Sequence, residues 1–211
     1  MTSLATALNL VSAPFTHFIS DDVLEHNTVR ELSAQFDRLR ALTQRAHSKP
    51  GGDKSYSMDF LALVVADQET DAVSALPSAW QDLCKALAHP NFRAALSRQT
   101  GIDVTGDRAE IGAYLHRSGD SVSVHCDKQH KSLSCILYLN EEWHDTDGGD
   151  FLLFATDDLD RPVQRITPTA GRLIVFAPVE DSWHAVSPIT ATRYVRQTLQ
   201  IEFTPAMCTD G

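Results

Sequence analysis

The chain has 211 residues, 43% of them hydrophobic, which is enough to bury one sizeable core, so we expect a single globular domain over residues 1–211. Its 18 basic and 28 acidic side chains give a formal charge of −10, which repels phosphate backbones and anionic lipid. The sequence has no basic run that would offset this charge and no apolar segment long enough to cross a membrane. We therefore expect no nucleic-acid partner, no membrane association and a cytoplasmic location.

The first hundred residues are expected to support the rest of the fold. Apolar residues at helical spacing, such as Val29, Leu32 and Phe36, follow capping side chains at 20–22 and predict an amphipathic helix. In chain order, the expected elements are a strand at 14–20, a helix ending near Ala46, a loop at 47–55, a buried strand at 56–67, and two helices within 78–99 broken at Pro90.

After Gly101 the sequence changes to short β-rich runs separated by turn residues. The predicted strands are 110–116, 121–127, 132–139, 150–155, 163–166, 172–177, 183–187 and 193–204. Strands this closely spaced favour a sandwich or barrel such as a jelly roll. The fold class is therefore mainly β with N-terminal helices (α+β), in which residues 1–100 support a core at 101–205.

The four cysteines, Cys84, Cys126, Cys135 and Cys208, show no C-x-x-C spacing and are too few for a disulfide framework at this length. We therefore expect free thiols.

The segment VSVHCDKQH, residues 122–130, places a histidine and an aspartate two positions apart in a strand-like run. Side chains alternate along a strand, so His125 and Asp127 face one side while Cys126 faces the other. Such a pair is weak evidence for a metal site by itself, because a chain with nine histidines is expected to contain roughly one such pair by chance. A second histidine, His184, lies on a later predicted strand and completes a set of two imidazoles and a carboxylate. That set is typical of non-haem Fe(II) oxygenases, which leave the other metal positions open.

The last predicted strand carries an arginine with a predicted role. Because side chains alternate along a strand, Arg193 shares a mostly apolar face with Val195 and Leu199. Arg196 shares the opposite, polar face with Thr198. We therefore expect Arg193 to point inward and Arg196 to point to solvent. A buried guanidinium needs a carboxylate from the protein or from a ligand, and its planar fork suits bidentate binding.

Longer segments carry a family resemblance. Besides H-C-D at 125–127, His184 and Arg193, the matching stretches are SCILYLNEEW at 134–143, DGGDFLLF at 147–154, GRLIVFAP at 171–178 and HAVSPITATRY at 184–194. In this order, from about Ile111 to Phe203, the chain resembles the 2-oxoglutarate and Fe(II)-dependent oxygenases of the prolyl-4-hydroxylase-like branch.

The resemblance implies a double-stranded β-helix fold and a set of site residues. His125, Asp127 and His184 would bind iron, and Arg193 would pair with the far carboxylate of 2-oxoglutarate, with no catalytic residue beyond the iron centre. Tyr138 and Tyr114 would donate hydrogen bonds to that carboxylate. Fe(II), 2-oxoglutarate and O2 would be required, and ascorbate is a candidate reductant.

Three functions fit these residues. The compact chain favours a dioxygenase that hydroxylates an unactivated C–H bond of a small amino-acid-like metabolite, while the branch resemblance favours a prolyl hydroxylase acting on a protein or peptide; the motifs leave desaturation and ring closure open. A cupin-like metal protein or zinc hydrolase is the third alternative, but hydrolysis has no use for an inward Arg193. We expect residues 47–58 and 103–120 to shape the substrate pocket.

Overall fold

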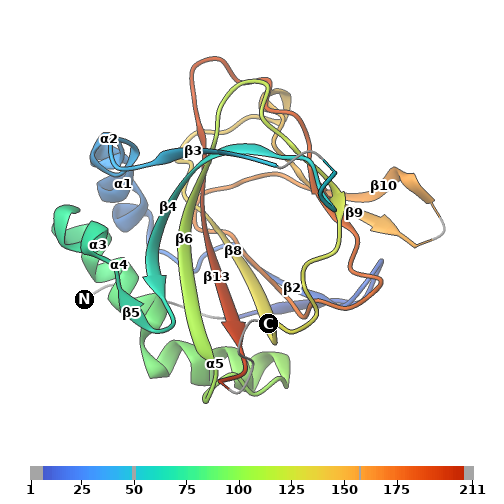
Figure 1. Cartoon of the computed structure of the whole chain (residues 1–211), viewed down its shortest axis with the longest axis horizontal. Helices are drawn as coiled ribbons and strands as arrows, with labels where there is room; N and C mark the ends of the chain where they lie inside the picture. The colour runs from blue at the N-terminus through green and yellow to red at the C-terminus, as the bar shows by residue number, and fades with distance from the viewer. Residues whose placement is uncertain (1–6, 49–50, 157, 207–211) are drawn as a thin grey trace.

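Two antiparallel sheets face each other in the computed structural model, which describes residues 7–48, 51–156 and 158–206 (Figure 1). The larger sheet has nine strands: β1 (Asn9–Val11), β2 (His17–Ser20), β11 (Leu173–Phe176), β8 (Leu133–Tyr138), β13 (Arg196–Thr204), β6 (Arg108–His116), β4 (Ser57–Val65) and β3 (Gln44–His47) in spatial order, with β5 (Gln68–Glu69) paired to β4. The smaller sheet has the order β10 (Asp158–Ile166), β9 (Phe151–Ala155), β12 (His184–Val186) and β7 (Val122–His125). The chain is thus mostly β.

The helices gather on one side of the larger sheet, away from β9 and β10 (Figure 1). They are α1 (His26–Ala34), α2 (Phe36–Arg40), α3 (Asp71–Ala75), α4 (Ser78–Ala88) and α5 (Pro90–Thr100), with a 3-10 turn η1 at Asp145–Asp147. The break predicted at Pro90 is confirmed: proline occupies the first position of α5, where its missing N–H costs no helical hydrogen bond. No helix within the described ranges is long and apolar enough to cross a membrane.

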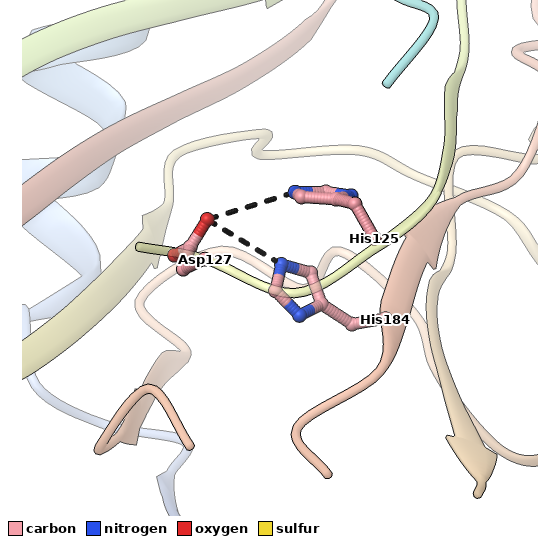
Figure 2. Close-up of side chains that lie close together, drawn as sticks. All are labelled: His125, Asp127 and His184. Carbon is pink, nitrogen blue, oxygen red and sulfur yellow. Dashed lines mark ion pairs between the residues drawn. The ribbon is translucent and has the colours of Figure 1, made fainter. Parts of the chain in front are cut away.

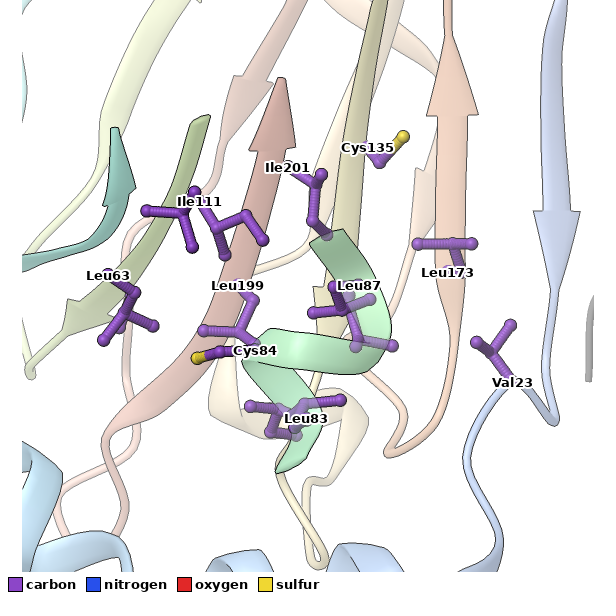
Figure 3. Close-up of a cluster of buried hydrophobic side chains, with 14 of the residues drawn as sticks. Val23, Leu63, Leu83, Cys84, Leu87, Ile111, Cys135, Leu173, Leu199 and Ile201 are labelled. Carbon is purple, nitrogen blue, oxygen red and sulfur yellow. The ribbon is translucent and has the colours of Figure 1, made fainter. Parts of the chain in front are cut away.

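The main hydrophobic core lies between the helices and the outer face of the larger sheet (Figure 3). Leu83 and Leu87 of α4 are fully buried there, together with Leu199 and Ile201 of β13. Because side chains alternate along a strand, the opposite face of β13 carries Thr198, Gln200 and the other polar residues and looks toward the smaller sheet. The space between the two sheets is therefore partly polar, and a cavity occupies it.

Some predicted elements differ in the structure. The single helix expected to end near Ala46 is divided into α1 and α2, and α2 ends at Arg40. Residues 44–47 form β3, because this segment pairs with residues 57–60 of β4. Helical spacing alone does not detect a strand partner that arrives later in the chain. The strands β1 and β5 and the short helix α3 were not predicted, whereas the buried strand expected at 56–67 is confirmed as β4.

Three of the cysteines, Cys84, Cys126 and Cys135, are free thiols as predicted, and Cys208 lies outside the described residues.

Candidate functional site

His125, Asp127 and His184 meet at one point, as their spacing predicted (Figure 2). His125 ends β7 and His184 begins β12, and these two strands pair with the two histidines as direct partners. Asp127 Oδ1 lies 3.6 Å from His125 Nε2 and 3.9 Å from His184 Nε2, and one ligand atom from each residue falls within 4.8 Å of the others. Two imidazole nitrogens and a carboxylate at this spacing can hold one divalent cation.

Hydrogen bonds orient each of the three side chains. His125 Nδ1 donates to the Ser123 carbonyl at 2.9 Å, and His184 Nδ1 donates to the Ser182 carbonyl at 2.8 Å. Each Nε2 is therefore the acceptor nitrogen of its ring, which is the tautomer that a metal requires. In this structure His125 Nε2 accepts a hydrogen bond of 3.2 Å from Lys54 Nζ. The Asp127 Oδ2 atom accepts a hydrogen bond of 2.9 Å from the Ser134 hydroxyl, which leaves Oδ1 for the centre.

The ionisation states suit cation binding. Burial lowers the pKa of His184 to about 4, so its imidazole is neutral at pH 7. Burial alone would raise the pKa of Asp127, but its interactions with the adjacent His125 and His184 and the charges of Lys131 and Lys54 outweigh burial and lower this pKa. At pH 7 the centre thus offers a neutral histidine and a carboxylate anion.

A cavity of about 210 Å³ extends from the three residues into the space between the sheets. Its wall combines apolar side chains such as Phe151 with polar groups from β6 and β13, including Tyr114, His116, Arg196, Gln200 and Glu202. Lys54 and Met58 also line it, so both segments expected to shape the pocket, 47–58 and 103–120, contribute to this wall.

Arg196 lies in this cavity and is 1% exposed. Its Nε donates to the Gly149 carbonyl at 2.8 Å, and its Nη2 donates to the Tyr138 hydroxyl at 3.3 Å. Among the residues that the structure describes, no carboxylate forms an ion pair with this guanidinium. Burial lowers the pKa of Arg196, although arginine keeps its charge in proteins. A buried cation of this kind calls for an anionic ligand.

The prediction that Arg193 points inward and Arg196 outward is wrong. Arg193 is exposed and precedes β13, which begins at Arg196. The alternation within the strand was correct, since Leu199 and Ile201 share one face. The error came from taking the apolar face for the inner one, whereas helices cover that face and the polar face lines the cavity.

Tyr138 and Tyr114 occupy different parts of the site. Tyr138 is fully buried, and its ring centroid lies 5.1 Å from Arg196 Cζ, so it stands at the guanidinium. Tyr114 lines the cavity from β6 and packs on Phe60 with ring centroids 5.0 Å apart. Their roles toward a carboxylate stay predictions.

Sequence reasoning missed a group of ion pairs beside the cavity. Asp120 follows β6 and accepts hydrogen bonds from Arg45 Nη1 at 2.7 Å and from the Ser57 hydroxyl at 2.6 Å. Although burial opposes ionisation, these bonds lower the pKa of Asp120 to about 2. Asp59 on β4 also pairs with Arg45, at 3.5 Å, and with Arg117, at 2.6 Å. The group ties β3 and β4 to the end of β6 and so holds the strand that carries Met58 at the cavity.

Two properties of the site test whether iron and 2-oxoglutarate would fit it. The donor set of two imidazoles and one carboxylate suits Fe(II) and leaves positions for further ligands. The buried Arg196, without a carboxylate among the described residues, suits the far end of a dicarboxylate. The residues therefore fit both groups.

Comparisons with known proteins agree with this chemistry. Residues 110–199 match the sequence model of the 2OG-Fe(II) oxygenase superfamily, a family that uses Fe(II), 2-oxoglutarate and O2. The prolyl 3-hydroxylase OGFOD1 of Xenopus laevis is 30% identical over 112 residues, which are 50% of this chain and 22% of that protein. The chain thus spans about a fifth of the length of this relative.

Solved structures share the fold. A prolyl-4-hydroxylase from Pseudomonas putida aligns with a TM-score of 0.64 at 22% identity, covering 90% of this chain and 92% of that one. A prolyl hydroxylase from Trichoplax adhaerens, solved with a peptide of the hypoxia inducible factor oxygen degradation domain, aligns with a TM-score of 0.60 at 18% identity, covering 89% and 83%. Residues 110–199 thus carry the sequence pattern of the 2OG-Fe(II) oxygenase superfamily, and the chain shares the fold of these prolyl hydroxylase structures.

Proposed function

We propose that this chain hydroxylates an unactivated C–H bond, with iron held by His125, Asp127 and His184 and with the far carboxylate of 2-oxoglutarate held by Arg196. The observation that carries the proposal is the buried Arg196 guanidinium, which lines the same cavity as the three candidate ligands and has no carboxylate partner among the described residues. A zinc hydrolase or cupin-like protein with the same ligands would have no use for this cation.

In this proposal each part of the cavity has a separate task. The two Nε2 atoms and Asp127 Oδ1 would hold the cation, which would supply oxidative chemistry with O2 and 2-oxoglutarate when bound. Arg196 and the adjacent Tyr138 hydroxyl orient the dicarboxylate through its far end, since a planar guanidinium fixes the direction of a carboxylate. Phe151 and Ile136, both buried at the cavity, limit the access of water.

The substrate that we favour is a prolyl residue of a peptide or protein. The support is that one relative of similar sequence and two of the structures of similar fold are named prolyl hydroxylases, one of them solved with a peptide. The small amino-acid-like metabolite favoured by the sequence is the second candidate, and the volume of about 210 Å³, which also has to hold 2-oxoglutarate, supports a small reacting group. Both candidates present a compact aliphatic carbon to the metal.

The proposal is tested first by binding and then by turnover. Anaerobic addition of Fe(II) and 2-oxoglutarate should give a weak visible charge-transfer band in the wild-type protein and none in Asp127→Ala. Metal binding without this band would favour the cupin-like or zinc alternative. Proline-containing peptides and free amino acids are then compared for substrate-stimulated succinate formation. Stimulation by free amino acids alone would refute the peptide substrate, and stimulation by peptides alone would refute the metabolite.

We also propose that the facing sheets are the halves of a double-stranded β-helix, or jelly roll, and that residues 1–211 form one domain. Support comes from the shared core, in which α4 packs directly on the larger sheet. The cytoplasmic location, the absence of nucleic-acid and membrane partners, and ascorbate as reductant stay predictions.

A further inference from the structure

His116, the last residue of β6, is a buried polar side chain without a protein partner. It is 1% exposed, and neither of its ring nitrogens has a hydrogen-bond partner within the described part of the chain. Leaving such a group unpaired in the interior costs free energy, so buried polar side chains are normally hydrogen-bonded. The unpaired imidazole therefore points to a partner that is not part of the polypeptide.

The position of His116 indicates what that partner is. In the antiparallel pairing of β6 with β13, His116 is the direct partner of Arg196. Directly opposed side chains project from the same face of a sheet, with Cβ atoms roughly 5 Å apart. Both residues line the cavity that begins at His125, Asp127 and His184. A ligand carboxylate that reaches Arg196 thus also reaches the neighbourhood of the His116 ring.

The charge state of His116 makes it a donor that adds no charge. Burial, followed by the neighbouring positive charge of Arg196, lowers its pKa to about 3, so the ring is neutral at pH 7. A neutral imidazole keeps one N–H donor. One cation already balances one carboxylate at this end of the cavity, and a neutral donor leaves that balance unchanged.

The free N–H groups of Arg196 are too few to satisfy a bound carboxylate completely. Its Nε is used by the Gly149 carbonyl, and one N–H of Nη2 is used by Tyr138. A carboxylate has about four lone-pair sites to satisfy when it leaves water. The remaining N–H groups of one guanidinium cannot fill all of them, because they point in one plane from one side.

We propose that His116 donates a hydrogen bond to the far carboxylate of the cosubstrate and so completes, with Arg196 and the Tyr138 hydroxyl, a clamp for this group. The proposal rests on the proposed function. It assigns His116 a direct contact with the ligand and predicts that its contribution depends on the presence of the far carboxylate.

The test compares two keto acids that differ in that carboxylate. The affinities of Fe(II)-loaded protein for 2-oxoglutarate and for 2-oxobutanoate, which has the same keto-acid end but no far carboxylate, are measured anaerobically from the charge-transfer band. His116→Phe keeps the ring size but loses the donor, and should weaken 2-oxoglutarate by about tenfold to a hundredfold, as expected for a hydrogen bond to a charged group. Its affinity for 2-oxobutanoate should not change, and His116→Gln, which restores an N–H donor, should recover most of the loss.

A general disturbance of the pocket would weaken both keto acids equally, and this result would overturn the proposal. So would an unchanged 2-oxoglutarate affinity in His116→Phe when Arg196→Met weakens it, an outcome that leaves the proposed function intact. Wild-type protein that binds iron but shows no 2-oxoglutarate binding would overturn both. If His116→Phe does not fold, His116→Leu makes the same comparison, with a melting curve as the folding control.

Discussion

Replacing Arg196 with methionine should weaken 2-oxoglutarate binding without destabilising the ligand-free protein. The two effects differ because the guanidinium is buried without a carboxylate partner among the described residues. If Arg196 had only a structural role, its removal would lower the stability of the ligand-free protein instead. Measuring stability without the ligand and affinity for the ligand therefore distinguishes a binding role of Arg196 from a structural role.

The magnitudes follow from the contacts. A bidentate pair with the far carboxylate consists of two hydrogen bonds to a charged group, each contributing roughly 1.5 kcal/mol or more. Losing about 3 kcal/mol raises the dissociation constant about 150-fold. In the ligand-free protein, Arg196→Met loses the bonds to Gly149 at 2.8 Å and Tyr138 at 3.3 Å, about 1 kcal/mol each. It also removes a desolvated cation, whose burial costs several kcal/mol, so the melting temperature should stay equal or rise.

The assay uses Arg193→Met as the matched control, because Arg193 is exposed and lies three positions earlier on the same segment. Dissociation constants come from anaerobic titration with 2-oxoglutarate, and melting temperatures are measured with and without the ligand. A saturating ligand at a hundred times its dissociation constant should stabilise wild type and Arg193→Met by about 2.7 kcal/mol, and Arg196→Met far less. Loss of affinity in Arg193→Met, or a strong destabilisation of ligand-free Arg196→Met with unchanged affinity, would refute the reasoning.

Three further predictions concern metal binding, pH and a turn. Asp127→Ala removes the carboxylate of the candidate metal centre and should weaken Fe(II) binding by more than about a hundredfold in a direct titration; near wild-type affinity would contradict the assignment. The pKa of His116 falls from 6.5 to about 3 on folding, so the unfolded chain takes up the proton first and stability decreases as the pH falls below 6.5. Between pH 7 and pH 5 the free energy of unfolding of the wild type, measured with urea, should therefore fall by about 2 kcal/mol more than that of His116→Phe. Parallel pH curves for the two proteins would contradict this prediction. Gly148→Ala places a Cβ 2.1 Å from the Pro188 carbonyl oxygen at a φ of +68°, and should lose on the order of 3 kcal/mol, whereas Gly51→Ala, at a similar φ but in open space, should lose about 1 kcal/mol; equal losses would mean that the contact is relieved cheaply.

The meeting of the three candidate ligands could be predicted because it depends on local rules. Strand alternation puts His125 and Asp127 on one face, and the order of the matching segments brings His184 beside them. The arginine could not be assigned by the same rule, since parity separates two faces without saying which one is covered. The amphipathic helices of the first hundred residues were the available signal, because their apolar sides need an apolar sheet face to pack on.

The role of residues 44–47 and the position of His116 depended on pairing between distant strands. β3 forms because β4 lies beside it, and His116 faces Arg196 because β6 and β13 are in this register. The spacing of residues within one segment does not determine its register with a distant strand. The network around Asp120 was missed for the same reason, since Arg45 is 75 residues away in the chain.

Because the main core lies outside the space between the sheets, the residues that stabilise the fold are largely separate from those that line the cavity. Most of the apolar burial that stabilises the chain joins α4 and its neighbours to the back of the larger sheet. Replacements on the front of β6 and β13 would therefore leave that packing largely intact. A scaffold arranged in this way can accumulate replacements in its cavity, and so change what the cavity binds, while it continues to fold.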